Sequence, residues 1–190
     1  MKTETARARN PSFVEGCHFA NAARRTSRGG MANTSKTLSE ILAMLAAHGV
    51  ACDVFGGWAE EMLGLRAPGP HSDIDLIYRA DGFTALDAAL ANLENVLRAV
   101  PAKLFPHKRA FLFRETLCEI TLVTQDDVGP VTYFWGDLAY RWEQPLLHPE
   151  VIAFGSSSFS VVSAPNLVKY RIDRKSRQPD RWREFAKRNG

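Results

Sequence analysis

The chain has 190 residues, which suits one domain with a short appendage, since a domain usually holds roughly 100–200 residues. Apolar side chains make up 45% of it and charged ones 24%, which excludes disordered, collagen-like and disulfide-rich classes. No apolar run approaches the roughly 20 residues that span a bilayer, and residues 1–30 contain no secretory signal. Three cysteines without metal-type spacing indicate free thiols, so we expect a cytoplasmic protein.

Charge is divided unevenly along the chain, although the net charge is only +3. Residues 1–30 carry +4, residues 31–168 carry −7 and residues 169–190 carry +6. The acidic middle argues against a broad nucleic-acid surface there, whereas the basic C-terminal segment could attract phosphate groups. We therefore expect three segments: a disordered basic tail (1–33), a globular domain (34–163) and a basic helical C-terminal segment (164–190).

Capping signals and hydrophobic periodicity predict the elements of the globular domain in chain order. Thr37 and Glu40 form a capping box that starts the first helix, and Gly49 ends it. The predicted helices are 37–48, 58–63, 81–97, 165–175 and 179–187. The predicted strands are 50–55, 73–79, 110–114, 117–124, 151–154 and 159–162. This order predicts an α+β (mixed α/β) domain, with a small mixed sheet flanked by helices and a short helical C-terminus.

Two aspartates at the start of a predicted strand form the most informative motif. Asp73 and Asp75 are two residues apart, so their side chains point to the same face of the strand. Neighbouring carboxylates repel each other unless a cation lies between them, and Mg²⁺ is satisfied by one or two carboxylates plus phosphate oxygens and water. The pair therefore predicts a metal–nucleotide complex as the partner.

Two further features support this interpretation. Gly56 and Gly57 precede a short predicted helix, where glycine lets backbone amides approach a phosphate. Glu119 lies in the apolar strand 117–124, and an acid in such a strand needs a partner or a role. Joining the aspartate pair would supply that role.

These motifs together resemble a known family. Gly-Gly-Trp-Ala at 56–59, then Glu61, then His-Ser-Asp-Ile-Asp-Leu at 71–76, are similar to the nucleotidyltransferase superfamily, which has the DNA polymerase beta-like fold. The resemblance is strongest to the aminoglycoside and lincosamide nucleotidyltransferases, and it extends over about residues 37–123. The family usually has a basic residue shortly before the histidine, where this chain has Pro-Gly-Pro at 68–70.

The resemblance implies roles for single residues. Asp73 and Asp75 are expected to hold Mg²⁺, Gly56 and Gly57 to contact the triphosphate, and Glu119 to complete the catalytic acids as general base. Further nucleotide contacts are expected from His71, Ser72 and Lys169. The implied reaction moves AMP from ATP, or another nucleoside monophosphate from its triphosphate, to a hydroxyl of a small molecule, such as an aminoglycoside- or lincosamide-like antibiotic.

Other interpretations stay open at this point. The acceptor could be a protein or RNA, as in the toxin–antitoxin branch of the superfamily, or the chain could be a non-catalytic nucleotide-binding module. Glu119 could pair with Arg114 or a nearby lysine, and His71 could only position its loop. Residues 107–109, His-Lys-Arg, are interpreted as a charged loop. Aromatic residues that could stack on an acceptor, or pack in a core, are Tyr133, Phe134, Trp135, Tyr140 and Trp142.

Overall fold

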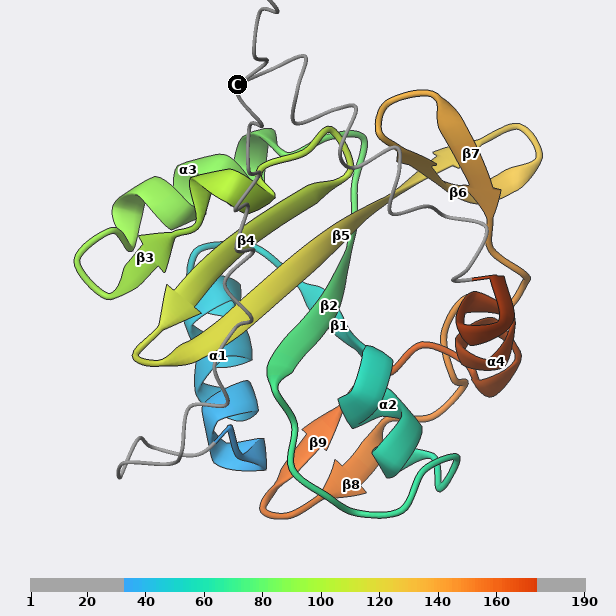
Figure 1. The fold of residues 1–190 in the computed structure, drawn as a ribbon, viewed down its shortest axis with the longest axis horizontal. Helices are drawn as coiled ribbons and strands as arrows, with labels where there is room; N and C mark the ends of the chain where they lie inside the picture. Colours follow the sequence, from blue (N-terminus) through green and yellow to red (C-terminus); the bar gives the residue numbers. More distant parts are fainter. Residues whose placement is uncertain (1–32, 174–190) are drawn as a thin grey trace, which may run out of the picture. The chain divides into compact units, whose positions relative to one another are not determined.

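A computed structural model describes residues 33–173 of the chain (Figure 1). The helices are α1 (Ser35–Ala47), α2 (Gly56–Met62), α3 (Thr84–Asn92) and α4 (Ala164–Asp173), with a 3-10 helix η1 (Pro101–Lys103). The strands are β1 (Cys52–Phe55), β2 (Asp73–Arg79), β3 (Leu97–Ala99), β4 (Lys108–Phe113), β5 (Thr116–Asp126), β6 (Gly129–Phe134), β7 (Leu138–Arg141), β8 (Ile152–Phe154) and β9 (Ser157–Phe159).

Seven of these strands form one mixed sheet. Its main order is β1-β2-β5-β4-β3, and β6 and β7 continue from β5. β2 and β5 are parallel, whereas the other neighbouring strands of this sheet are antiparallel. β8 and β9 form a separate hairpin. The predicted fold class, a mixed sheet with flanking helices, is therefore confirmed.

Strand β2 has one apolar face that packs in the hydrophobic core and an opposite face that carries the acids. Ile74 and Leu76 are fully buried, and by strand alternation they point away from Asp73 and Asp75. On the core side they belong to the same cluster as the apolar face of α1, which passes behind the sheet in Figure 1. The buried residues of that face include Leu38, Ile41 and Leu45. Full burial of such a side chain stabilises the fold by about 1.5–3 kcal/mol, so the strand that presents the acids is firmly held.

Several predicted helix boundaries were wrong: the helices predicted to begin at residues 58 and 81 begin at Gly56 and Thr84. The first helix begins at Ser35, because Thr34 and not Thr37 is its N-cap: the Thr34 hydroxyl accepts the Thr37 N–H at 3.2 Å. The helix predicted to reach Leu97 ends at Asn92, and Leu97 starts β3. The helical spacing of leucines gave the wrong end because Leu97 continues that spacing by coincidence. It is buried as part of the edge strand β3 and not as part of the helix.

Three strands were missed, namely β3, β6 and β7. Each is short, and β6 begins with Gly129 and Pro130, residues that sequence patterns assign to turns. Two aromatic residues of this region pack inward, since Tyr140 and Trp142 are buried and contact Tyr170 of α4, whereas Tyr133 is exposed. The core interpretation of these two aromatics is confirmed.

Part of the sequence prediction lies outside the described residues. This applies to the basic tail, apart from Asn33, and to the second C-terminal helix at 179–187. Between residues 33 and 173, no helix combines the length and apolar character needed to cross a bilayer.

Candidate active site

The start of β2 brings the predicted acids together. Asp75 lies opposite Phe55 of β1 on one side and opposite Glu119 of β5 on the other. Asp73 lies two residues earlier on the same face. Residues from three separate stretches of sequence thus meet in one row across the sheet.

The surroundings of Asp75 oppose its ionisation. Burial of the carboxyl group, and next the Asp73 carboxylate, raise the pKa of Asp75 to about 7, although Lys108 offsets part of this effect. A cation placed beside such a carboxyl group stabilises its charged form and so lowers its pKa again. Hard oxygen donors in such a pair fit Mg²⁺, with the remaining positions left for phosphate oxygens and water.

Glu119 has partners of its own. Its side chain is 8% exposed, and its two carboxylate oxygens accept hydrogen bonds from Lys103 and Lys108, one from each ammonium group. Burial opposes ionisation of Glu119, but the two lysines outweigh it and hold the pKa below its ordinary value. Arg114 binds Glu40 at 2.9 Å instead. The pairing of Glu119 with nearby lysines, one of the alternatives from sequence, is what the structure shows.

The charged loop predicted at 107–109 is not a single cluster. His107 is buried, and its Nδ1 accepts the backbone N–H of Trp135 at 3.0 Å. Lys108 reaches Glu119, whereas Arg109 binds Asp87 of α3 at 2.6 Å. Lys108 and Arg109 are neighbours in β4, so strand alternation sends their side chains to opposite faces, and His107 precedes the strand.

The Gly56-Gly57 turn lies directly against the acids. Gly56 has a φ of +62°, and a β-carbon at this position would collide with the Asp75 carboxylate. A β-carbon at Gly57 would lie 2.9 Å from Nη1 of Arg66 and 3.0 Å from Nδ1 of His71. Arg66 was missed from sequence, since it precedes the Pro-Gly-Pro loop and only the folded chain brings its guanidinium to the turn. It supplies a basic group near the place where the family pattern has one.

His71 is a buried residue that holds the turn. Its Nε2 lies 2.9 Å from Oε2 of Glu61, with 3% of the His71 side chain exposed, and its ring stacks on Trp58 at 4.0 Å. The next residue, Ser72, is exposed, and its hydroxyl donates to Oδ1 of Asp73 at 2.9 Å. The geometry therefore favours a positioning role for both, with Ser72 in contact with a predicted metal ligand.

Asn33, which lies outside the motif, forms hydrogen bonds with residues of the site. Its amide donates to the carbonyl oxygens of His71 at 3.3 Å and Asp73 at 2.8 Å, and its own oxygen accepts from Nε1 of Trp58 at 3.3 Å. Three hydrogen bonds from one side chain thus connect the start of β2 to α2. Sequence reasoning placed this residue in the tail, and an isolated asparagine carries no signal that could have identified the contact.

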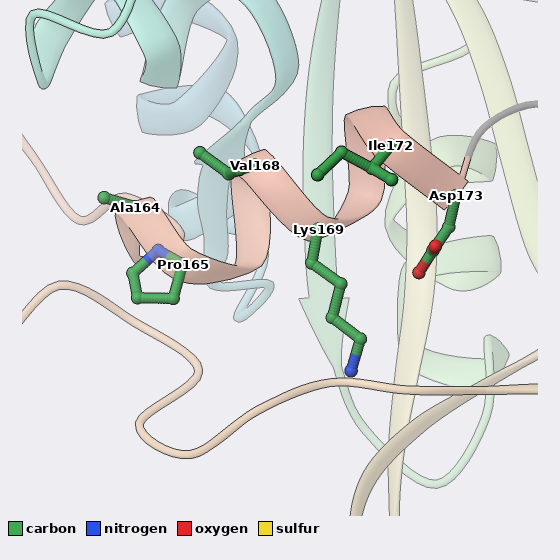
Figure 2. Close-up of a pocket in the computed structure, with 6 residues that line it drawn as sticks. All are labelled: Ala164, Pro165, Val168, Lys169, Ile172 and Asp173. Atoms are coloured by element: carbon green, nitrogen blue, oxygen red, sulfur yellow. The ribbon is translucent and has the colours of Figure 1, made fainter.

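Lys169, another predicted site residue, binds groups at and just after the end of β7. Its ammonium donates to the Arg141 carbonyl at 3.1 Å and lies 3.4 Å from Glu143. Figure 2 shows its side chain projecting from α4. The same helix borders a groove of about 430 Å³ whose apolar lining includes the exposed Val168 and Ile172. Lys169 is the predicted site residue in this lining.

Within residues 33–173, no set of three or more His, Cys, Asp or Glu side chains is arranged to hold a metal. Asp73 and Asp75 therefore fit an ion whose other ligands come from a bound substrate or water. The lysine partners of Glu119 keep it out of such a set in this structure.

A protein-family model matches the part of the chain that contains these site residues. The C-terminal domain of phosphoribosyl-dephospho-CoA transferase MdcG matches residues 23–131, more than half of the chain. The chain belongs to the MdcG family. The segment matched by MdcG contains the glycine turn, both aspartates and Glu119, whereas α4 follows it. A comparison with curated proteins finds no match.

Solved structures similar to this MdcG-family chain are nucleotidyltransferase structures. ANT(2'')-Ia in complex with adenylyl-2''-tobramycin has a TM-score of 0.55 and 18% identity, over 76% of this chain and 78% of that one. The lincosamide antibiotic adenylyltransferase LnuA, with lincomycin bound, has a TM-score of 0.59 and 16% identity, over 74% and 87%. TM1012 of Thermotoga maritima, a candidate nucleotidyltransferase, has a TM-score of 0.51 and 12% identity, over 81% and 92%. At these low identities the structural similarity shows the fold alone, and the expected nucleotidyltransferase fold is confirmed.

Proposed function

We propose that the chain is a Mg²⁺-dependent nucleotidyltransferase, which moves a nucleoside monophosphate, AMP from ATP, to a hydroxyl of a small molecule. The observation that carries this proposal is the contact between the Gly56 turn and Asp75, where a β-carbon has no room. A backbone turn open to phosphate, placed against two carboxylates on one strand face, suits a triphosphate and its metal ion together.

The residues of the turn and of β2 bind the donor in this proposal. Asp73 and Asp75 hold Mg²⁺, which supplies positive charge for the transferred phosphoryl group and the departing pyrophosphate. Gly56 and Gly57 let backbone amides approach the phosphates. We assign the phosphate-binding cation to Arg66 in place of Lys169, because the guanidinium of Arg66 lies at the turn.

Glu119 is the proposed base. As the acceptor oxygen bonds to the α-phosphorus, its proton passes to Glu119 and the bond to the pyrophosphate oxygen breaks. Both oxygens of Glu119 hold lysines in this structure, so one lysine has to release it first. The anionic donor is a group that can bind the released lysine.

The acceptor proposed first is an aminoglycoside- or lincosamide-like antibiotic. Its support is the similar fold of a protein solved with adenylyl-2''-tobramycin and of one solved with lincomycin. A protein or RNA acceptor is the alternative, supported by the charge of +6 on residues 169–190.

The match to the phosphoribosyl-dephospho-CoA transferase MdcG favours a second donor, a phosphoribosyl-dephospho-CoA compound. Such a donor carries phosphates, so the glycine turn and Arg66 suit it for the same reason that they suit ATP. The two donors differ in the group that is transferred, which separates them in one assay.

The deciding experiment follows transfer from labelled donors. The chain is incubated with Mg²⁺, each α-labelled nucleoside triphosphate or a phosphoribosyl-dephospho-CoA donor, and a panel of aminoglycosides, lincosamides, RNA and proteins. We expect pyrophosphate release that depends on an acceptor, is lost in Asp73→Asn and is kept in Asp127→Asn, an exposed control. Nucleotide binding that needs no metal and survives Asp73→Asn would instead indicate a non-catalytic binding module.

A further inference from the structure

The two lysines on Glu119 are the feature that the proposed function leaves unexplained. Enzymes that place three carboxylates in one row can hold two divalent ions between them. Here the third carboxylate is buried, with 8% of its side chain exposed, and Lys103 and Lys108 occupy both of its oxygens. A metal ligated by Glu119 would have to displace an ammonium group from one oxygen and bind beside the other.

The fold presents both lysines to Glu119. Lys108 begins β4, and Ala110 of the same strand lies opposite Glu119, so strand alternation sends Lys108 to the same face as Glu119. Lys103 ends η1, and its N–H donates to the Val100 carbonyl at 2.9 Å. Between them, the backbones of Phe105 and Lys108 exchange two hydrogen bonds of 3.1 Å. The turn at 103–108 is thus built to place two ammonium groups on one carboxylate.

The charge of this arrangement equals that of a divalent ion. Two ammonium groups bring two positive charges to Glu119, next to the aspartate pair, since Asp75 and Glu119 are direct neighbours across parallel strands. We propose that the site binds one divalent cation per chain, on Asp73 and Asp75, and that Lys103 and Lys108 take the place of a second ion at Glu119. This inference rests on the proposed function only for the metal site at the two aspartates.

Metal stoichiometry tests the proposal without any turnover. Mn²⁺ alone is titrated into the full chain, and free Mn²⁺ is followed by electron paramagnetic resonance. We expect one ion per chain, with affinity at least tenfold lower in Asp75→Asn. In Glu119→Gln, which keeps the shape of the side chain, we expect one ion as before, because Glu119 is not a ligand. Its affinity should be weaker, because the charges of Lys103 and Lys108 beside the aspartates are no longer neutralised.

A second variant tests the replacement by lysine directly. In Lys103→Met/Lys108→Met, Glu119 loses both cations, and we expect a second Mn²⁺ to bind, provided that circular dichroism shows a folded chain. Two ions in the unchanged chain, or a single ion in the folded double variant, would overturn the proposal. If Asp73→Asn and Asp75→Asn leave Mn²⁺ binding unchanged, the metal site of the proposed function fails instead.

Discussion

Glu61 and His71 lie 2.9 Å apart next to the glycine turn, and less than a tenth of either side chain is exposed. The same Glu61 oxygen also accepts the Gly69 N–H at 3.1 Å, so one carboxylate fixes both the histidine and the loop before β2. The family resemblance pointed to these residues, and the contact gives a physical reason for the pairing of an acid in α2 with the histidine.

Replacing Glu61 tests this contact. Glu61→Ala leaves the buried His71 Nε2 without its partner, so the free energy of unfolding should fall by about 1–3 kcal/mol in urea titrations. Glu115→Ala, at an exposed turn between β4 and β5, is the control and should change it by less than about 0.5 kcal/mol. Equal effects of the two variants would show that the contact adds no stability.

Substitution of two glycines distinguishes the effect of backbone strain from the effect of a steric collision at the site. Gly56 and Gly64 both have positive φ, at +62° and +69°, but a β-carbon at Gly64 meets nothing within 4 Å. Gly64→Ala should therefore lower the unfolding free energy by about 1–2 kcal/mol through strain alone. Gly56→Ala should lower it further, and should weaken Mn²⁺ binding at least tenfold because it displaces Asp75. Similar Mn²⁺ affinity in both variants would contradict the close contact at Gly56.

Asp75 should destabilise the chain when no metal is present. Its pKa is about 7 in the folded chain and about 3.8 ordinarily, so the folded chain keeps a proton that the unfolded chain loses. Stability is then lost as the pH rises from about 4 to about 7. In chelator at pH 8, Asp75→Asn should melt about 2–4 °C higher, which is roughly 1 kcal/mol in a chain of this size. The exposed Asp127→Asn should show no gain, and a lower melting temperature in Asp75→Asn would refute the argument.

His107 should make the chain sensitive to acid. Burial, and next the Lys108 charge, lower the pKa of His107 from 6.5 to about 3. The unfolded chain binds this proton first, so stability is lost as the pH falls from about 6.5 towards 3. His107→Asn keeps an acceptor for the Trp135 N–H and removes the titration, so its unfolding free energy should vary less across this range. His48→Asn, at the exposed end of α1, should keep the full slope.

Elements with a strong local signal could be predicted from sequence. The bounds of β2 were correct because alternation of Ile74 and Leu76 with the aspartates leaves one register that buries the apolar pair. The turn between β4 and β5 was also located, since Phe113 and Thr116 are its closing pair. β3 and β7 hold only three and four residues, and β6 opens with Gly129 and Pro130, so no clear alternation marks these strands.

Sequence reasoning left lysine pairing of Glu119 as one alternative and could not name the partners of the site, because distant segments of the chain bring them together. Lys103 and Lys108 reach Glu119 from another strand and turn, and Arg66 reaches Gly57 across a loop. In each case the partners are separated by nine or more positions, and no spacing rule connects them. Motif residues identify what chemistry a site holds, whereas these contacts decide the charge that surrounds it.

The hydrogen bonds of Asn33 have a practical consequence for shortening the chain. A version that begins at Thr34, the N-cap of α1, would keep every described helix and strand, together with all the motif residues. It would lose the side chain that ties the His71 and Asp73 carbonyls to Trp58. Such a trimmed protein would pass a test of secondary structure, although the strand that carries Asp73 and Asp75 would have lost a hydrogen bond at its first residue. Engineered versions of this domain should therefore include Asn33, which precedes the first helix.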